Sequence, residues 1–311
     1  MDNQLLKTGG FILTKENRVL FHFPDKRFVL STAQDQGGYC SVHSVTYEQS
    51  NLQSTCLLGT RKNSSAVNLL LQGSASIDNQ GYSCLSWHSQ SIEVVIIADV
   101  GENAIRAGET YYKKQADLSG GIFIFAFIPA KVSKGDMAKL LLTVTEAKTA
   151  VLQELAIVSP YEGMPATGTY DDEVVLVTNP QNDVLDTVSF AAAKSVVAQA
   201  VKQALKDSLA LGSRMSPWRQ SMIEERLWRL GFENICSADL PNETTKTQVL
   251  LSFCQSVWLE YCWGLIGIDG LYQFFSFLES PLFAPNGLSL SRAFRQKISA
   301  QMEDGNQSKT E

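Results

Sequence analysis

Residues 120–155 read GGIFIFAFIPAKVSKGDMAKLLLTVTEAKTAVLQEL, and this stretch decides the fold class. No polar side chain occurs between Gly121 and Ala130, which is typical of a central strand covered on both faces. The period then changes, because Ser133 and Asp136 have the spacing of a helix capping box and apolar residues recur at helical spacing up to Leu155. We therefore expect a buried strand followed by a helix over about residues 134–156.

Short runs of β-branched and aromatic residues precede this stretch, separated by Gly, Asn, Asp and Ser. After the helix come one more such run, EVVLVTN at 173–179, and a second amphipathic segment around residues 196–205. Strands followed by helix, strand and helix indicate an α+β fold, with mixed or antiparallel β-sheets packed against long helices. The expected early strands cover residues 11–14, 18–23, 27–32, 41–47, 67–71 and 92–99.

Glycine and proline signals near residue 212 divide the chain. We expect an α+β domain over residues 10–212, a helix-rich C-terminal extension over 213–300 and a disordered polar tail over 301–311. The apolar run at 249–278 is interrupted by charged residues and glycines, whereas a membrane span needs about 20 predominantly apolar residues. It therefore favours a buried or subunit-facing helical hairpin, and with it a homo-oligomer, over a membrane span.

Composition excludes several partners. A net charge of -6 without a basic stripe repels phosphate backbones, so we expect no nucleic acid partner. The N-terminal MDNQLLKTGGFIL lacks the basic region and apolar core of a secretory signal, which predicts a cytoplasmic protein with reduced cysteines. The six cysteines form no C-x-x-C pair and the three histidines form no H-E-x-x-H motif, so we expect no metal site.

Lys148 lies within the apolar stripe of the expected helix. At about 100° per residue it is about 40° from Val144, whereas Glu146 is about 200° from Val144 and points the other way. A lysine in such a stripe snorkels to the surface, pairs with an anion or loses its proton. The sequence leaves both snorkelling and a partnered or catalytic lysine open.

Residues 166–172, ATGTYDD, form a loop that leads into the strand EVVLVTN. They combine the hydroxyls of Thr167 and Thr169 with a permissive Gly168 and two carboxylates, the second of which is Asp172. A hydroxyl beside an acid is typical of acyl transfer or water activation, although the same residues also form ordinary turns.

Two other strand ends carry candidate binding residues. Gly37 and Gly38 follow the run at 27–32, where backbone amides are able to receive an oxyanion, although a hairpin turn needs the same glycines. The run at 92–99 leads into a polar loop that contains Asn103 and Arg106, and such loops commonly carry sites.

Read in chain order, these segments resemble the adenosylcobinamide amidohydrolase family over about residues 10–210. The resemblance is carried by VLSTAQDQGG, NLLLQGSAS, IIADVGENAIRAG, the stretch at 120–155 and ATGTYDDEVVLV. Its most specific part is TEAKTA at 145–150, followed about twenty residues later by Thr167-Gly168-Thr169 and Asp172. The resemblance implies hydrolysis of the amide that joins aminopropanol to the corrinoid ring, releasing adenosylcobyric acid. Cobalt then enters only as part of the corrinoid substrate, and no other cofactor is expected.

The chain departs from the family pattern at three places. Gln36 stands where members usually have Asn before the glycine pair, and Tyr170 and Asp171 replace Gly and Thr in a T-G-T-G-T-D motif. Gly101-Glu102 precedes Asn103-Ala104 where members read G-L-S-N-A. The bulk of Tyr170 alters how closely a substrate approaches, so these departures bear on the exact substrate.

We hypothesise amide hydrolysis in which the carboxylate, assisted by the lysine or by a glutamate, activates water or a threonine hydroxyl, while glycine amides and an asparagine stabilise the oxyanion. The candidate catalytic residues are Asp172, Lys148, Glu146, Thr167 and Thr169. The candidate substrate-binding residues are Gly37, Gly38, Asn103, Arg106 and Gly168. Two alternatives stay open: a corrinoid-binding or scaffold protein that has lost catalysis, and a hydrolase of a different amide.

Overall fold

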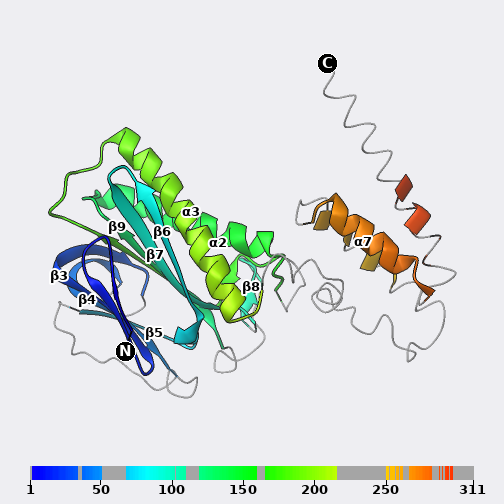
Figure 1. Cartoon of the computed structure of the whole chain (residues 1–311), viewed down its shortest axis with the longest axis horizontal. Coiled ribbons are helices and arrows are strands. Elements are labelled where there is room, and N and C mark those ends of the chain that lie inside the picture. The colour runs from blue at the N-terminus through cyan, green and yellow to red at the C-terminus, as the bar shows by residue number, and fades with distance from the viewer. Residues whose placement is uncertain are drawn as a thin grey trace. The chain divides into compact units, whose positions relative to one another are not determined.

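The computed structural model describes residues 2–33, 37–50, 68–101, 103–109, 119–159 and 165–215, together with parts of the region between 250 and 296. The chain divides into two compact units, Met1–Ser216 and Pro217–Glu311. All of the strands named below belong to the first unit (Figure 1).

Nine strands of the first unit form one mixed sheet. Pairing runs in the order β1-β2-β3-β11-β9-β7-β6, and β4 pairs with β3 and β5. The β9–β11 and β4–β5 pairs are parallel and the other pairs are antiparallel. The strands are β1 (Asp2–Leu5), β2 (Phe11–Lys15), β3 (Arg18–Ser31), β4 (Gly38–Gln49), β5 (Asn68–Gly73), β6 (Gln80–Trp87), β7 (Gln90–Asp99), β9 (Gly121–Ile128) and β11 (Asp172–Thr178). A short 3-10 helix, η1 (Ile77–Asn79), precedes β6, and β8 (Ala104–Ile105) pairs with β10 (Gly168–Thr169) in a separate two-stranded sheet.

The long strand β3 lets the sheet form two layers. Its first half pairs with β2 and β4, and its second half pairs with β4 and β11. Aromatic side chains fill the space between the layers: the ring centroids of Phe21 and Phe125, and likewise those of Tyr47 and Phe123, lie 4.7 Å apart. Every second residue of β9 contributes to this inner core.

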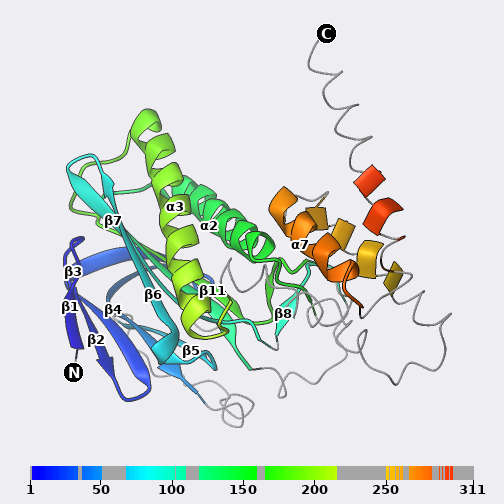
Figure 2. The ribbon, with the colours of Figure 1, turned by 45° about the vertical axis from the view of Figure 1, so that its right-hand side comes forward.

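The alternate residues of β9 face two helices, α2 (Lys134–Glu154) and α3 (Thr187–Leu211). Figures 1 and 2 show the helices side by side on one face of the large sheet. Ile122, Ile124 and Ala126 lie with Leu140 and Val144 of α2 in a second core. All eight residues of β9 are buried, which confirms the expected central strand and, with the mixed sheet, the α+β class.

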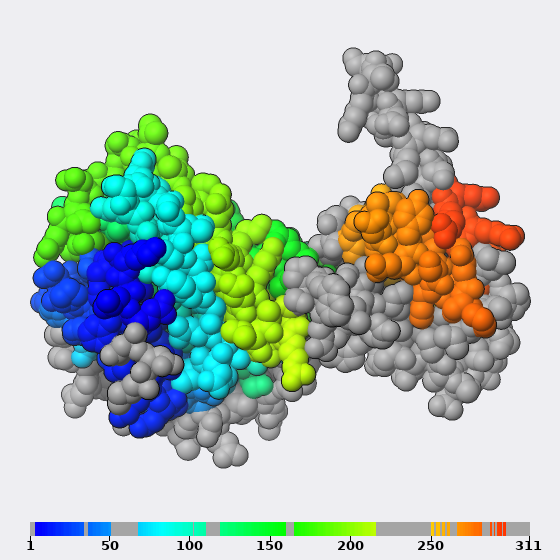
Figure 3. Space-filling view, viewed as in Figure 1, coloured from blue at the N-terminus to red at the C-terminus, as the bar shows by residue number. Residues whose placement is uncertain are grey.

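Local sequence signals explain the helix boundaries. The Ser133 hydroxyl accepts a hydrogen bond from the backbone N–H of Asp136 at 3.1 Å, as the capping box requires. Asp186 caps α3 in the same way through the N–H of Ser189 at 2.7 Å, and α3 ends at Leu211 before Gly212. Figure 3 shows β6 and β7, in cyan, between the N-terminal strands in blue and α3 in yellow-green.

The structure corrects the expected strand list in two respects. The runs at 18–23 and 27–32 belong to one strand, β3, in which the pairing register shifts between His22 and Arg27. Pro24 lies at this irregularity, where its missing N–H costs no ladder hydrogen bond. The expected list also lacks β1, β6 and the two short strands β8 and β10.

The second unit contains α7 (Ile268–Leu278), whose buried face joins residues of the segment 250–258 in a third apolar cluster. The buried face consists of Leu271, Phe274, Phe275 and Leu278. Within the part of the chain that the structure describes, no helix is long and apolar enough to cross a membrane. The tail expected at 301–311 lies outside the described residues, and a homo-oligomer formed through the C-terminal helices stays a prediction.

Candidate active site

Lys148 and Asp172 form an ion pair where α2 passes the start of β11. Lys148 Nζ donates a hydrogen bond to Asp172 Oδ2, and the two side chains are 9% and 19% exposed. The apolar stripe of α2 turns Lys148 towards the sheet, and its ammonium group reaches the carboxylate instead of solvent. Of the alternatives that the sequence left open, the structure therefore shows a partnered lysine.

Thr169 supplies two more hydrogen bonds to the same carboxylate. Its hydroxyl donates to Asp172 Oδ1 at 2.6 Å, and its backbone N–H donates to Asp172 Oδ2 at 3.1 Å. Both carboxylate oxygens are thus fixed, one by a hydroxyl and the other by an ammonium group and an amide. The arrangement joins a potential nucleophile, a proton acceptor and a cation within one hydrogen-bonded cluster.

A side chain at Gly168 would displace the groups of this cluster. A Cβ atom there would collide with Asp172 Oδ2 and would lie 2.8 Å from Lys148 Nζ. The glycine of the Thr167-Gly168-Thr169 motif therefore makes room for the ion pair.

The Thr167 hydroxyl has a different environment from that of Thr169. It accepts a hydrogen bond from the backbone N–H of Ala107 at 2.8 Å, while the backbone N–H of Thr167 donates to the carbonyl of Ile105 at 2.8 Å. Thr149 of α2 donates through its hydroxyl to the Thr167 carbonyl at 3.0 Å. Thr167 therefore holds the loop in place, and Thr149 links this loop to α2, a contact that no local sequence pattern predicts, although TEAKTA contains Thr149.

Asn103 and Arg106 organise the neighbouring loop. The Asn103 carbonyl accepts from the backbone N–H of Tyr170 at 3.1 Å, and Arg106 Nη1 donates to the Pro165 carbonyl at 3.0 Å. Asn103 is 1% exposed, and its side-chain Oδ1 has no hydrogen-bond partner among the described residues. Both residues thus hold the segment that contains Thr167, and the Asn103 amide is covered in this structure.

Gly37 and Gly38 lie at the same end of the sheet's strands as Asp172, but not beside its carboxylate. Gly38 pairs with Ser31, which pairs on its other side with Val175. Two strand spacings, about 10 Å, therefore separate the backbone of Gly38 from β11. Gly37 is exposed next to it, and no hydrogen bond joins either glycine to Asp172 in the described residues.

Glu146 does not join the cluster. It is exposed on α2, about 200° around the helix from the buried Lys148. The hypothesis that this glutamate assists Asp172 is not supported by its position, because helix geometry turns the two side chains to opposite faces. Of these two residues, Lys148 contacts Asp172.

A second carboxylate adjoins the site. Burial raises the pKa of Asp171 to about 6, and the nearby charge of Asp172 adds to the effect. Burial also raises the pKa of Tyr47 on β4, to which the charges of Asp171 and Glu173 contribute. The start of β11 therefore concentrates negative charge, and Lys148 is the cation that offsets it at Asp172.

Comparison with known proteins shows the family to which this chain belongs. Residues 6–217, which contain the cluster and every strand of the large sheet except β1, match the sequence model of a family of hydrolases acting on amides. That family is adenosylcobinamide amidohydrolase (CbiZ), and the chain belongs to it.

The individual relatives and solved structures that match this chain do not narrow its function further. An uncharacterized protein of Methanocaldococcus jannaschii is 27% identical over 219 residues, which cover 61% of this chain and 85% of that protein. Two solved structures show weak likeness at 10% identity. The PH0078 protein of Pyrococcus horikoshii has a TM-score of 0.36, covering 66% of this chain and 84% of its own. A β-aminopeptidase of Burkholderia sp. has a TM-score of 0.38, covering 72% of this chain and 91% of its own.

Proposed function

We propose that this chain hydrolyses the amide that joins aminopropanol to the corrinoid ring of adenosylcobinamide, releasing adenosylcobyric acid. The observation that carries the proposal is the cluster of Lys148, Asp172 and Thr169, formed by the residues on which the family resemblance most depends. In this proposal cobalt belongs to the corrinoid substrate, and the chain supplies no cofactor of its own.

The cluster supplies the groups that amide hydrolysis requires. Asp172 accepts a proton as the nucleophile attacks the amide carbon, and Lys148 keeps a positive charge beside the developing oxyanion. The carbon–nitrogen bond then breaks, and the proton passes to the leaving nitrogen. The products are a free aminopropanol amine and a carboxylate on the corrinoid.

Two nucleophiles are compatible with the geometry. The Thr169 hydroxyl already donates to Asp172, so transfer of its proton would generate an alkoxide that forms an ester intermediate, later hydrolysed by water. Alternatively, Asp172 activates water directly, because its side chain is more exposed than Thr169. The second route leaves Thr169 as a residue that orients the carboxylate.

Substitutions of Thr169 distinguish the two routes. A threonine nucleophile predicts that Thr169→Ser retains turnover and that Thr169→Val loses at least about 10³-fold, with an ester adduct visible by mass spectrometry of quenched wild-type enzyme. A water nucleophile predicts no adduct and a loss of about 10-fold in Thr169→Val, because only the orientation of the carboxylate changes.

Incubation of the purified full chain with adenosylcobinamide tests the activity itself. We expect mass spectrometry to detect adenosylcobyric acid together with one equivalent of aminopropanol. Asp172→Asn should lower kcat by about 10²–10⁴-fold and Lys148→Met by at least about 10²-fold. Glu146→Gln, on the exposed face of the same helix, is the matched control and should leave turnover unchanged.

The outcomes separate the alternatives. Tight binding of adenosylcobinamide without product would support a corrinoid-binding protein that has lost catalysis. Release of amine from a panel of other amides, without action on adenosylcobinamide, would indicate a hydrolase with a different substrate. If Lys148→Met folds and turns over like wild type, the ion pair takes no part in the reaction.

A further inference from the structure

A second polar cluster lies at the opposite end of β11 from Asp172. Arg27 follows the register shift in β3, and its side chain enters a small, partly open cavity, in which the centre of a water-sized sphere has about 10 Å³ available, enough for about one small occupant. Thr178, which also lines the cavity, is six residues from Asp172 along the strand, or about 20 Å at about 3.3 Å per residue. The cavity is therefore separate from the proposed active site.

Arg27 is a buried cation without a carboxylate partner among the described residues. It is 6% exposed, and Nη2 donates to the carbonyls of Thr8 and Gly9, each at 3.2 Å. Neither carbonyl neutralises the charge, and no ion pair of the described residues includes Arg27. Burial lowers the pKa of Arg27, Asp25 raises it, and a guanidinium group keeps its proton even when buried.

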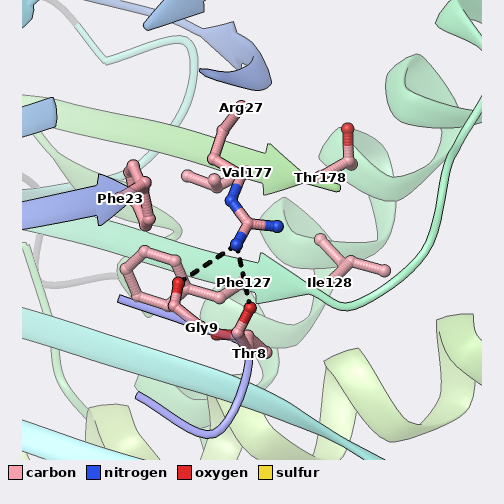
Figure 4. A pocket seen from close by; sticks show the side chains of 8 residues that line it. All are labelled: Thr8, Gly9, Phe23, Arg27, Phe127, Ile128, Val177 and Thr178. Atoms are coloured by element: carbon pink, nitrogen blue, oxygen red, sulfur yellow. Dashed lines mark hydrogen bonds between the residues drawn. The ribbon is translucent and has the colours of Figure 1, made fainter. Parts of the chain in front are cut away.

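Unused hydrogen-bonding groups accompany this charge. Arg27 Nε and the Thr8 hydroxyl are buried and have no partner among the described residues. Figure 4 shows the guanidinium group in the centre of the cavity, with the terminal nitrogen that makes no drawn hydrogen bond pointing towards Ile128 and Thr178. A buried donor without an acceptor costs free energy, so the cavity is arranged for an occupant that accepts hydrogen bonds.

We propose that this cavity binds one small monovalent anion of about the size of chloride. An anion beside Arg27 would neutralise the buried charge and accept the hydrogen bonds that the cluster leaves unmade. The rings of Phe23 and Phe127 line the same space, and the Arg27 guanidinium carbon lies 5.6 Å from the Phe23 ring centroid, so a bulky hydrated anion is excluded.

A neighbouring carboxylate limits the charge of the ligand. Glu93 is fully buried, and its Oε2 accepts from the backbone N–H of Thr8 at 2.7 Å, on the same turn that Arg27 holds. With Glu93 this close, a single guanidinium charge suits a monovalent anion better than phosphate or sulfate. The bound anion would fix the turn between β1 and β2 against β3.

Thermal unfolding of the full chain tests the site. Chloride replaces gluconate at constant ionic strength, so that only the anion that fits the cavity changes. We expect Tm to rise by about 2–5 °C between about 1 and 200 mM chloride, because a ligand that binds only the folded state stabilises it. Arg27→Met should abolish the rise, whereas Arg18→Met, which removes an exposed arginine paired with Glu48, should retain it.

Two further measurements keep the test decisive. If Arg27→Met fails to fold, Thr8→Val should weaken the chloride response while leaving the fold intact. Crystals soaked in bromide should give an anomalous peak at hydrogen-bond distance from the Arg27 guanidinium group. An equal Tm in chloride and gluconate together with no bromide peak would overturn the proposal, and neither result depends on whether the chain hydrolyses adenosylcobinamide.

Discussion

At the scale of single residues, the hydrogen bonds around Asp172 leave little room for change. Lys148 approaches from α2, Thr169 approaches from β10, and Gly168 lies between them without a side chain. The position of the carboxylate is therefore sensitive to a single added methyl group.

Gly168→Ala should disrupt the ion pair without unfolding the domain. The new Cβ atom would overlap with Asp172 Oδ2 and crowd Lys148 Nζ, so the carboxylate must move. We expect kcat for adenosylcobinamide to fall by about 10²-fold, since misplacement of about 1 Å is enough for such a loss. Gly135→Ala is the matched control: its Cβ would meet nothing closer than the Ser133 hydroxyl at 4.0 Å, so turnover and Tm should be maintained.

Asp171 makes stability depend on pH. Its pKa is about 6 in the folded chain against an ordinary value of 3.8, so the folded state binds the proton more tightly than the unfolded state does. The free energy of unfolding should therefore fall as pH rises from about 4 to about 6 and then level off. The shift corresponds to at most about 3 kcal/mol, and solvent screening reduces it to about 1–2 kcal/mol.

Asp171→Asn tests this dependence. Urea denaturation should show the variant to be more stable than wild type by about 1–2 kcal/mol at pH 8, with the difference disappearing near pH 4. Asp207→Asn, at an exposed position on α3, serves as the control and should show no such trend. A difference for Asp171→Asn that stays constant across this range would contradict the assignment.

At the scale of elements, helix α2 could be predicted from local sequence patterns alone. The capping box and the apolar stripe predicted α2, and the same stripe singled out Lys148. β6 could not be found in this way, because two of its three buried residues, Gly81 and Ser83, are small, and Trp87 alone gives no hydrophobic alternation. They are small because α3 lies directly on them: a Cβ atom at Gly81 would collide with the carbonyl of Ala204.

The residues of the candidate site could be predicted from local patterns, but their proximity could not. The sequence identified Lys148 and Asp172 separately, but only the register of β11 and the path of α2 bring them together. No local pattern gives the distance between the Gly37-Gly38 turn and Asp172, since it depends on two strand pairings.

One hydroxyl joins α3 to the sheet. The Ser208 hydroxyl accepts from the backbone N–H of Ala98 at 2.9 Å and donates to the Asn79 carbonyl at 2.5 Å. Ser208→Ala leaves both buried groups without this partner and should lower the free energy of unfolding by about 1–3 kcal/mol in urea denaturation. Ser195→Ala, on the exposed face of α3, should change it by less than about 0.5 kcal/mol. Equal effects would show that the buried hydroxyl does not anchor the helix.

At the scale of the whole molecule, the cluster of Lys148, Asp172 and Thr169 that carries the proposed reaction lies in the first unit. Both of its apolar cores consist of residues up to Met215, and the family match ends at residue 217. The third apolar cluster is confined to residues 250–278 of the second unit. Among the described residues, neither core of the first unit includes a residue of the second.

A chain that ends at Ser216 should therefore fold and act alone. We expect its near-ultraviolet circular dichroism to show fixed aromatic packing, its unfolding to be cooperative, and its kcat/KM for adenosylcobinamide to lie within about 3-fold of the full chain. Asp172→Asn in the same shortened chain is the control that ties any turnover to the cluster. A shortened chain that folds cooperatively but loses turnover would mean that the second unit contributes to the site, whereas an insoluble one would mean that the first unit requires the second for stability.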